Sequence, residues 1–189
     1  MVLVSIVIGL GIAHILLGIG GIIDRLSGRG ERLELSVAHA AWLAFCFLWM
    51  VMFWWWEYRF SSRVSEWTMG LYLFLITYAI SLFLISVVLV PRSWDGVTSL
   101  KDYFLERRVW FYSLLLLIVV LDTFDSYLKG GIEYILETGA TNIAFSISTI
   151  PVAIVGIKTE NMRFHSFAGV LFVSLQILLG FGYLDLLAF

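Results

Sequence analysis

Long apolar stretches alternate with short charged segments along the whole chain. The stretches cover residues 2–23, 36–56, 67–90, 109–127, 134–157 and 164–187. A helix that rises 1.5 Å per residue needs about 20 residues to cross the ~30 Å hydrocarbon core of a membrane, and each stretch is about that long. Helix is the expected conformation, because lipid offers the backbone no hydrogen-bond partner. The pattern predicts an all-α polytopic integral membrane protein, a compact bundle of six transmembrane helices.

The composition supports this fold class. Hydrophobic residues make up 61% of the chain and charged residues 14%, whereas soluble domains are near half apolar and a quarter charged. The six stretches leave little chain outside them, so we expect residues 1–189 to form a single transmembrane domain in the lipid bilayer. Cys46 is the only cysteine and the formal net charge is −2. The chain therefore has no intramolecular disulfide or cysteine-based zinc cage, and nucleic acid is not an expected partner.

Basic residues are distributed unequally between the loops. The first, third and fifth loops hold nine Lys and Arg residues and the remaining segments hold three. The nine are Arg25, Arg29, Arg32, Arg92, Lys101, Arg107, Arg108, Lys158 and Arg163, and the three are Arg59, Arg63 and Lys129. Because cytoplasmic loops carry the excess of basic residues, both termini are predicted to be non-cytoplasmic. The expected location is a bacterial inner (plasma) membrane.

Two local motifs refine this topology. Trp54, Trp55 and Trp56 end the second stretch, and clustered tryptophans are typical of an aromatic belt at the membrane interface, although a binding platform is an alternative. Ser99 stands three residues before Asp102, which is the spacing of a helix N-cap. A short interfacial helix is therefore predicted to begin near residue 100 and to turn into the fourth stretch at Arg107 and Arg108, whose guanidinium groups would face anionic lipid.

Polar residues far from the predicted interfaces are the candidates for function, because they are costly in lipid. His14 lies near the middle of the first stretch and shares a helical face with Gly11, Gly18 and Gly21. Glycines at this spacing allow close helix contact, so His14 is expected to point into the bundle. It is either a neutral histidine bonded to a neighbouring group or a proton-binding group.

The fourth stretch contains two carboxyl groups on one helical face, Asp122 and Asp125. Asp125 is four residues from Lys129, so an ion pair at the rim of the membrane is the simpler interpretation of this residue. Asp122 lies one turn deeper, about 4–5 Å from the midplane. It is expected either to be protonated or to be held ionised by a partner.

The fifth stretch carries a polar stripe, and its members are Thr138, Asn142, Ser146 and Thr149. Such a stripe either bonds neighbouring helices or lines a path. Pro151 removes one backbone hydrogen bond and predicts a kink, which is a gate or simply packing.

Gln176 lies near the middle of the sixth stretch. By helical rise, His14, Asp122, Asn142 and Gln176 fall within about 6–8 Å of one another along the membrane normal. The pattern does not show whether these four groups also meet laterally, because that depends on helix order.

Motifs of catalysis are missing from the sequence. The three histidines have no metalloprotease spacing, and no phosphate-binding loop, nucleophile elbow or dinucleotide fingerprint is present. We therefore expect no cofactor and no metal site, and an enzyme is the least favoured class.

Two hypotheses follow. The first is a small membrane transporter or ion channel, expected to be a homo-oligomer, that moves a proton or small ion past the intramembrane polar groups. It uses His14, Asp122, Asp125, Asn142, Ser146, Thr149 and Gln176 as the pathway and Pro151 as the gate or kink. The alternative is a non-catalytic membrane subunit or scaffold, in which the polar groups join helices and glycine faces dock a membrane-protein partner.

Overall fold

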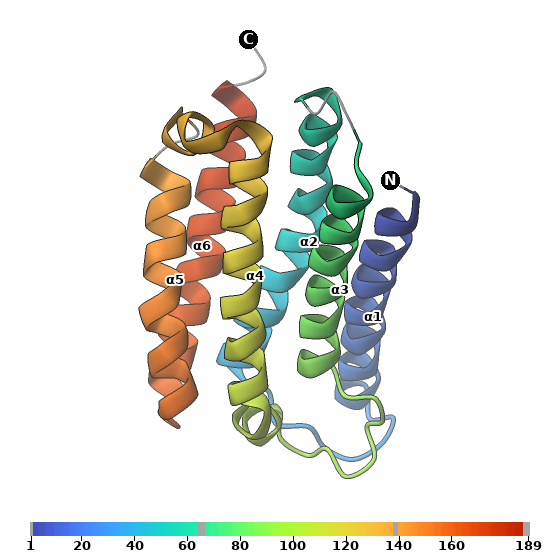
Figure 1. Cartoon of the computed structure of the whole chain (residues 1–189). Helices are drawn as coiled ribbons and strands as arrows, with labels where there is room; N and C mark the ends of the chain where they lie inside the picture. Colours follow the sequence, from blue (N-terminus) through green and yellow to red (C-terminus); the bar gives the residue numbers. More distant parts are fainter. Residues whose placement is uncertain (1, 64–66, 138–139, 187–189) are drawn as a thin grey trace.

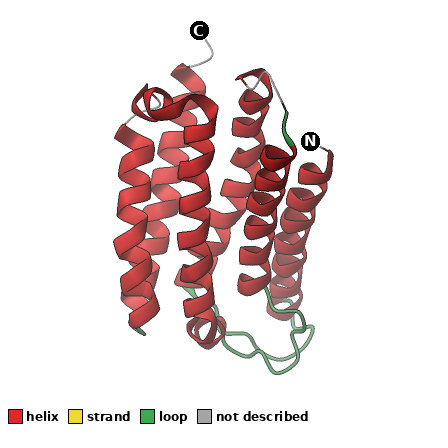
Figure 2. Cartoon of the chain, in the orientation of Figure 1, coloured by secondary structure: helices red, strands yellow, loops and turns green. Residues whose placement is uncertain are grey.

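The computed structural model describes the backbone of residues 2–63, 67–137 and 140–186, and the side chains of residues 2–57, 67–136 and 145–178. This part of the chain forms six helices, and the prediction of a helical protein is confirmed. They are α1 (Val2–Leu26), α2 (Val37–Arg63), α3 (Met69–Leu89), α4 (Leu100–Glu137), α5 (Ala140–Lys158) and α6 (Met162–Leu186). No strand occurs in it, as Figure 2 shows, and a single parallel bridge joins Glu34 to Ser99.

The helices run up and down alternately (Figure 1). The loops after α1 and α3 lie at one end of the bundle, whereas α1 begins and α6 ends at the opposite end. In space α2 packs mainly on α6, α1 packs on α3, and α4 lies between α3 and α5. Helix α2 also contacts α1, α3 and α4, so it occupies the interior of the bundle.

Four of these helices are long and apolar enough to cross a membrane, over Val2–Leu26, Val37–Glu57, Met69–Leu89 and Leu100–Leu136. The described apolar parts of α5 and α6 are shorter, at Phe145–Lys158 and Met162–Leu178. Large apolar side chains cover much of the outer surface, and examples are Leu17, Trp110, Phe167 and Leu178. A protein with this surface is a membrane protein by composition and length.

The outer end of α4 differs from the pattern of apolar stretches. Gly130 and Gly131 depart from helical geometry, and Gly131 has a φ of 68°, a conformation that favours glycine. Beyond this break a short helical segment folds away from the α4 axis (Figure 1). Residues 134–137 belong to this segment, so α5 begins at Ala140 rather than at the start of the predicted fifth stretch.

The predicted N-cap of α4 is present. The backbone N–H of Asp102 donates to Ser99 Oγ at 3.3 Å, and α4 begins at Leu100. The hydroxyl satisfies one of the N–H groups that the first turn of a helix leaves unpaired.

The glycine face of α1 is used inside the chain. Side-chain atoms of Met50, Val90 and Trp94 occupy the space where Gly11, Gly18 and Gly21, respectively, would carry a Cβ. At Gly18 an added Cβ would lie 2.6 Å from Val90 Cγ1. These three glycines therefore allow α1 to pack closely on its own neighbours, and this face offers nothing for a partner to dock on.

Candidate functional site

A group of buried charges lies between α2 and α4. The ammonium group of Lys129 forms ion pairs with both Glu57 and Asp125, and the distance from Nζ to Glu57 Oε1 is 3.0 Å. Exposed fractions are 2% for Glu57, 3% for Asp125 and 8% for Lys129. We call these three residues the charged cluster. Charges in such an environment are costly unless they are paired.

The pairing within the charged cluster is incomplete. Glu57 Oε2 and Asp125 Oδ1 are both buried and have no hydrogen-bond partner among the described residues. A buried acceptor without a donor costs about 1–3 kcal/mol, and more when it is charged. The two oxygens are therefore the acceptors of the charged cluster to which no described group donates.

Asp122 extends the cluster toward α3. Its Oδ1 accepts a hydrogen bond of 2.8 Å from the hydroxyl of Tyr78, which is 1% exposed. Asp122 also interacts electrostatically with Asp125, Lys129 and Glu57. Among the described residues, three carboxyl groups and one ammonium group therefore lie in this region, and the formal charge of these four side chains is −2 when all are ionised (three negative, one positive).

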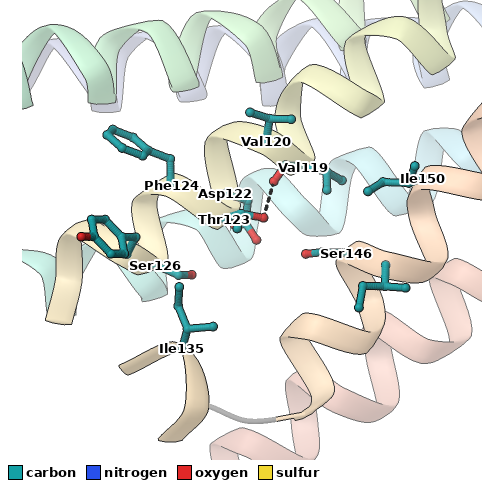
Figure 3. Close-up of a pocket in the computed structure, with 11 residues that line it drawn as sticks. Val119, Val120, Asp122, Thr123, Phe124, Ser126, Ile135, Ser146 and Ile150 are labelled. Atoms are coloured by element: carbon teal, nitrogen blue, oxygen red, sulfur yellow. Dashed lines mark hydrogen bonds between the residues drawn. The ribbon is translucent and has the colours of Figure 1, made fainter. Parts of the chain in front are cut away.

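The other side of Asp122 lines a groove between α4 and α5, with a volume of about 560 Å³. Figure 3 shows Ser146 of α5 facing Asp122 and Thr123 of α4 across this groove. Most of its wall is apolar, including Val120, Phe124, Ile135, Ile147 and Ile150. We call it the α4–α5 groove. Ile135 belongs to the segment beyond the glycine break, so this break places an apolar side chain at the groove.

The structure thus brings together Asp122 and Asp125 but leaves His14 elsewhere. His14 is half-buried between α1 and α3, with its ring centroid 6.4 Å from that of Phe83. Its Nε2 is buried and has no hydrogen-bond partner among the described residues. The expected inward orientation is observed, although the residue lies in a different helix interface from Asp122.

Gln176 lies in a third interface, between α6 and α2. When its amide is oriented to satisfy its surroundings, it donates to the backbone carbonyl of Phe45 at 3.0 Å and accepts from the N–H of Trp49 at 3.1 Å. Phe45 and Trp49 are four residues apart in α2, so the amide joins a carbonyl and an N–H that are partners in the regular hydrogen-bond pattern of a helix. This contact gives Gln176 a role in packing α6 onto α2.

The polar residues of α5 do not share one surface. Ser146 lines the groove, whereas Thr149 is fully buried and donates to the carbonyl of Phe145 at 2.7 Å. Asn142 lies outside the residues whose side chains are described. Pro151 is exposed, and α5 continues through it as one helix.

Sequence reasoning missed Glu57 and Tyr78. Glu57 follows the three tryptophans and was therefore grouped with the interfacial belt. Glu57 shares a helical face with Met50 and Phe53, which precede it by seven and four positions, and both of these side chains are buried. No comparable signal existed for Tyr78, because α3 is apolar all round.

A second set of polar groups lies near the starts of α4 and α6, at the other end of the bundle from the charged cluster. The hydroxyl of Tyr112 is 2.8 Å from Nδ1 of His165, and His165 Nε2 is 3.1 Å from the carbonyl oxygen of Thr159. A neutral imidazole protonated at Nε2 satisfies both contacts, because it accepts from the phenol and donates to the carbonyl. His39 is held separately, with Nε2 2.8 Å from the Leu89 carbonyl oxygen.

Comparison of the chain with protein-family models, with curated proteins and with solved structures found no match. Among the residues that the structure describes, no three His, Cys, Asp or Glu side chains are grouped as ligands for a metal ion.

Proposed function

We propose that this protein is a small proton-linked membrane transporter or ion channel whose proton-binding groups are Asp122, Asp125 and Glu57. In this proposal the six helices all cross the bilayer, both termini are non-cytoplasmic, and the membrane is a bacterial inner membrane. Helix α1 begins and helix α6 ends at the same end of the bundle, which supports this topology. The concentration of basic residues in three alternate loops supports it as well.

The observation that carries the proposal is the excess of carboxyl groups over the single ammonium group of Lys129. Net charge inside a membrane is costly, and uptake of a proton by any of the three acids lowers it. Two of these acids have a buried oxygen without a hydrogen-bond partner among the described residues. Uptake of a proton by the cluster would therefore lower its net charge, and the two oxygens without a partner are the positions that would bind it.

Asp122 has the position of an entry residue. It borders the α4–α5 groove on one side and interacts with Asp125 on the other. The hydroxyl of Tyr78 holds its carboxyl group in place by donating to Oδ1. A proton taken up at Asp122 from the groove would pass inward to Asp125 or Glu57, with Lys129 compensating the remaining charge.

The same geometry revises the predicted pathway. His14 and Gln176 lie in other helix interfaces, so the proposed proton site does not include them. Aromatic side chains fill the centre of the bundle, among them Trp42, Phe45 and Phe111. Since these side chains pack the centre of the described part of the bundle, the proposal includes assembly into a homo-oligomer.

Proton flux into liposomes tests the proposal. Purified protein is reconstituted with a pH-sensitive dye inside, and an imposed proton gradient starts the assay. We expect flux in the wild type and in Asp102→Asn, a control that neutralises an exposed carboxyl near the start of the same helix. We expect Asp122→Asn to reduce flux to the level of protein-free liposomes, because an amide cannot exchange the proton.

The result also decides between the two classes of function. No flux from a folded wild-type protein would overturn the transport proposal and favour a scaffold that joins membrane-protein partners. For that alternative the α1 glycine face gives no support, because the protein's own side chains fill it.

A further inference from the structure

The α4–α5 groove has a largely apolar wall and a single carboxyl group, that of Asp122. Its volume of about 560 Å³ lies within the range of small-molecule sites. The polar atoms at the groove come from Asp122, Thr123, Ser126 and Ser146, together with the hydroxyl of Tyr127. None of the residues that line it carries a positive charge.

Charge complementarity identifies the kind of molecule that fits. Beside Asp122 lie two further carboxyl groups and one ammonium group, so these four described side chains together carry excess negative charge. Glu57 and Asp125, both more than nine-tenths buried, each have an unpartnered oxygen in the same cluster. An apolar molecule with one positive charge would bury its body against the isoleucines and place its charge near Asp122.

The groove also has an access route suited to such a molecule. Its α5 wall includes Ile147 and Ile150, which are 64% and 44% exposed on the outer surface of the bundle. A lipophilic solute dissolved in the bilayer would therefore reach Asp122 sideways, without crossing the packed core.

We propose that the α4–α5 groove binds a lipophilic organic monocation from the bilayer, with Asp122 as its counter-ion. This inference rests on the proposed function and supplies its substrate class: the cation and the proton occupy the same carboxyl group in turn. Exchange of one for the other leaves the charge of the site unchanged, which is the requirement for coupling their movements.

Binding to the purified protein in detergent tests the inference. The probes are tetraphenylphosphonium and tetraphenylborate, which share size and shape but carry opposite charges. Isothermal titration calorimetry measures both, with titrations into empty micelles subtracted. We expect the wild type to bind the phosphonium at least about tenfold more tightly than the borate, as one favourable charge contact predicts.

Two pairs of variants locate the site. Asp122→Asn removes the charge and Ile147→Trp fills the groove, and each is expected to weaken phosphonium binding about tenfold or more. Their matched controls are Asp102→Asn, an exposed acid of α4, and Ile154→Trp, two helical turns along the same face of α5 and outside the groove. The controls are expected to bind as the wild type does, and gel filtration verifies that each variant is folded.

The outcomes separate the two proposals. Equal affinity for both probes, or undiminished phosphonium binding by folded Asp122→Asn, would overturn the cation site and mean that the groove holds only a lipid chain. If the wild type instead prefers the phosphonium but shows no proton flux in liposomes, either without or with the phosphonium added, the cation site stands and the proposed proton-linked transport is wrong.

Discussion

The polar side chains near the two ends of α4 are buried in different ways. At Tyr112 the partner is His165, which in turn bonds the backbone carbonyl of Thr159, and both contacts join a donor to an acceptor in a neutral arrangement. At Asp122, Asp125 and Lys129, about 15–25 Å further along the helix, the groups are ionisable and the acids outnumber the base.

This difference separates stabilising polar contacts from a candidate site. A neutral, fully bonded group such as Tyr112–His165 contributes to stability and leaves no position for another atom. The charged cluster leaves two carboxylate oxygens without a partner among the described residues, and selection for stability alone favours apolar replacement of such groups. The comparison therefore supports the proposal that the charged cluster is the functional group of α4 and that the Tyr112–His165 pair serves packing.

The largest expected effect is on stability, from Lys129→Met. This change leaves Glu57 and Asp125 without their ammonium partner in a buried site, and removing one partner of a buried ion pair costs roughly 3–5 kcal/mol. Thermal unfolding in detergent, followed by circular dichroism, measures the loss.

The control for that prediction is the triple variant Lys129→Met, Glu57→Gln and Asp125→Asn, because it also removes the two carboxylate charges that Lys129→Met leaves unpaired. It is expected to recover most of the lost stability. A triple variant as unstable as Lys129→Met alone would show that packing of the lysine side chain, and not its charge, is what α2 and α4 require.

An intermediate effect is expected from Tyr112→Phe. The phenol oxygen is lost and Nδ1 of His165 remains buried without a donor, at a cost of about 1–3 kcal/mol. Proton flux per folded molecule should not change, because this group has only a structural role. A folded Tyr112→Phe protein without flux would break the distinction between the two ends of α4.

The smallest effect on stability is expected from Asp122→Asn, below about 1 kcal/mol. The amide oxygen still accepts from Tyr78, and one charge of the excess is removed. The same unfolding measurement applies, with Tyr78→Phe as the comparison that removes the donor instead. A large loss of stability in Asp122→Asn would indicate that its charge serves folding, and the flux result would then need the Tyr78→Phe variant for its interpretation.

Much of the local structure follows from the sequence. The apolar stretches predict helices, since a chain this hydrophobic can satisfy its backbone in lipid only within each segment. Ser99 predicted the start of α4. The i,i+4 spacing of Asp125 and Lys129 predicted their ion pair, which is observed. Each of these depends on residues close together along one helix.

The candidate site could be predicted less completely from the sequence, because it depends on contacts between helices. The spacing predicted the Asp125–Lys129 pair but not that Glu57 of α2 packs against it and helps to bury both residues. The similar depths of His14, Asp122 and Gln176 left open whether the three meet laterally, and their contacts lie in three interfaces. Depth is set by position along a helix, while lateral neighbours are set by helix order.

The sequence by itself therefore determined the helices, their apolar surfaces, the cap of α4 and the local Asp125–Lys129 spacing, since these depend on the periodicity and propensity of nearby residues. Only the tertiary structure decided that α2 supplies Glu57, that α3 supplies Tyr78 to Asp122, and that α4 and α5 leave a groove beside it. The reason is physical: side-chain packing chooses which helix faces meet, and in a chain apolar on nearly every face the hydrophobic pattern does not distinguish one pairing from another.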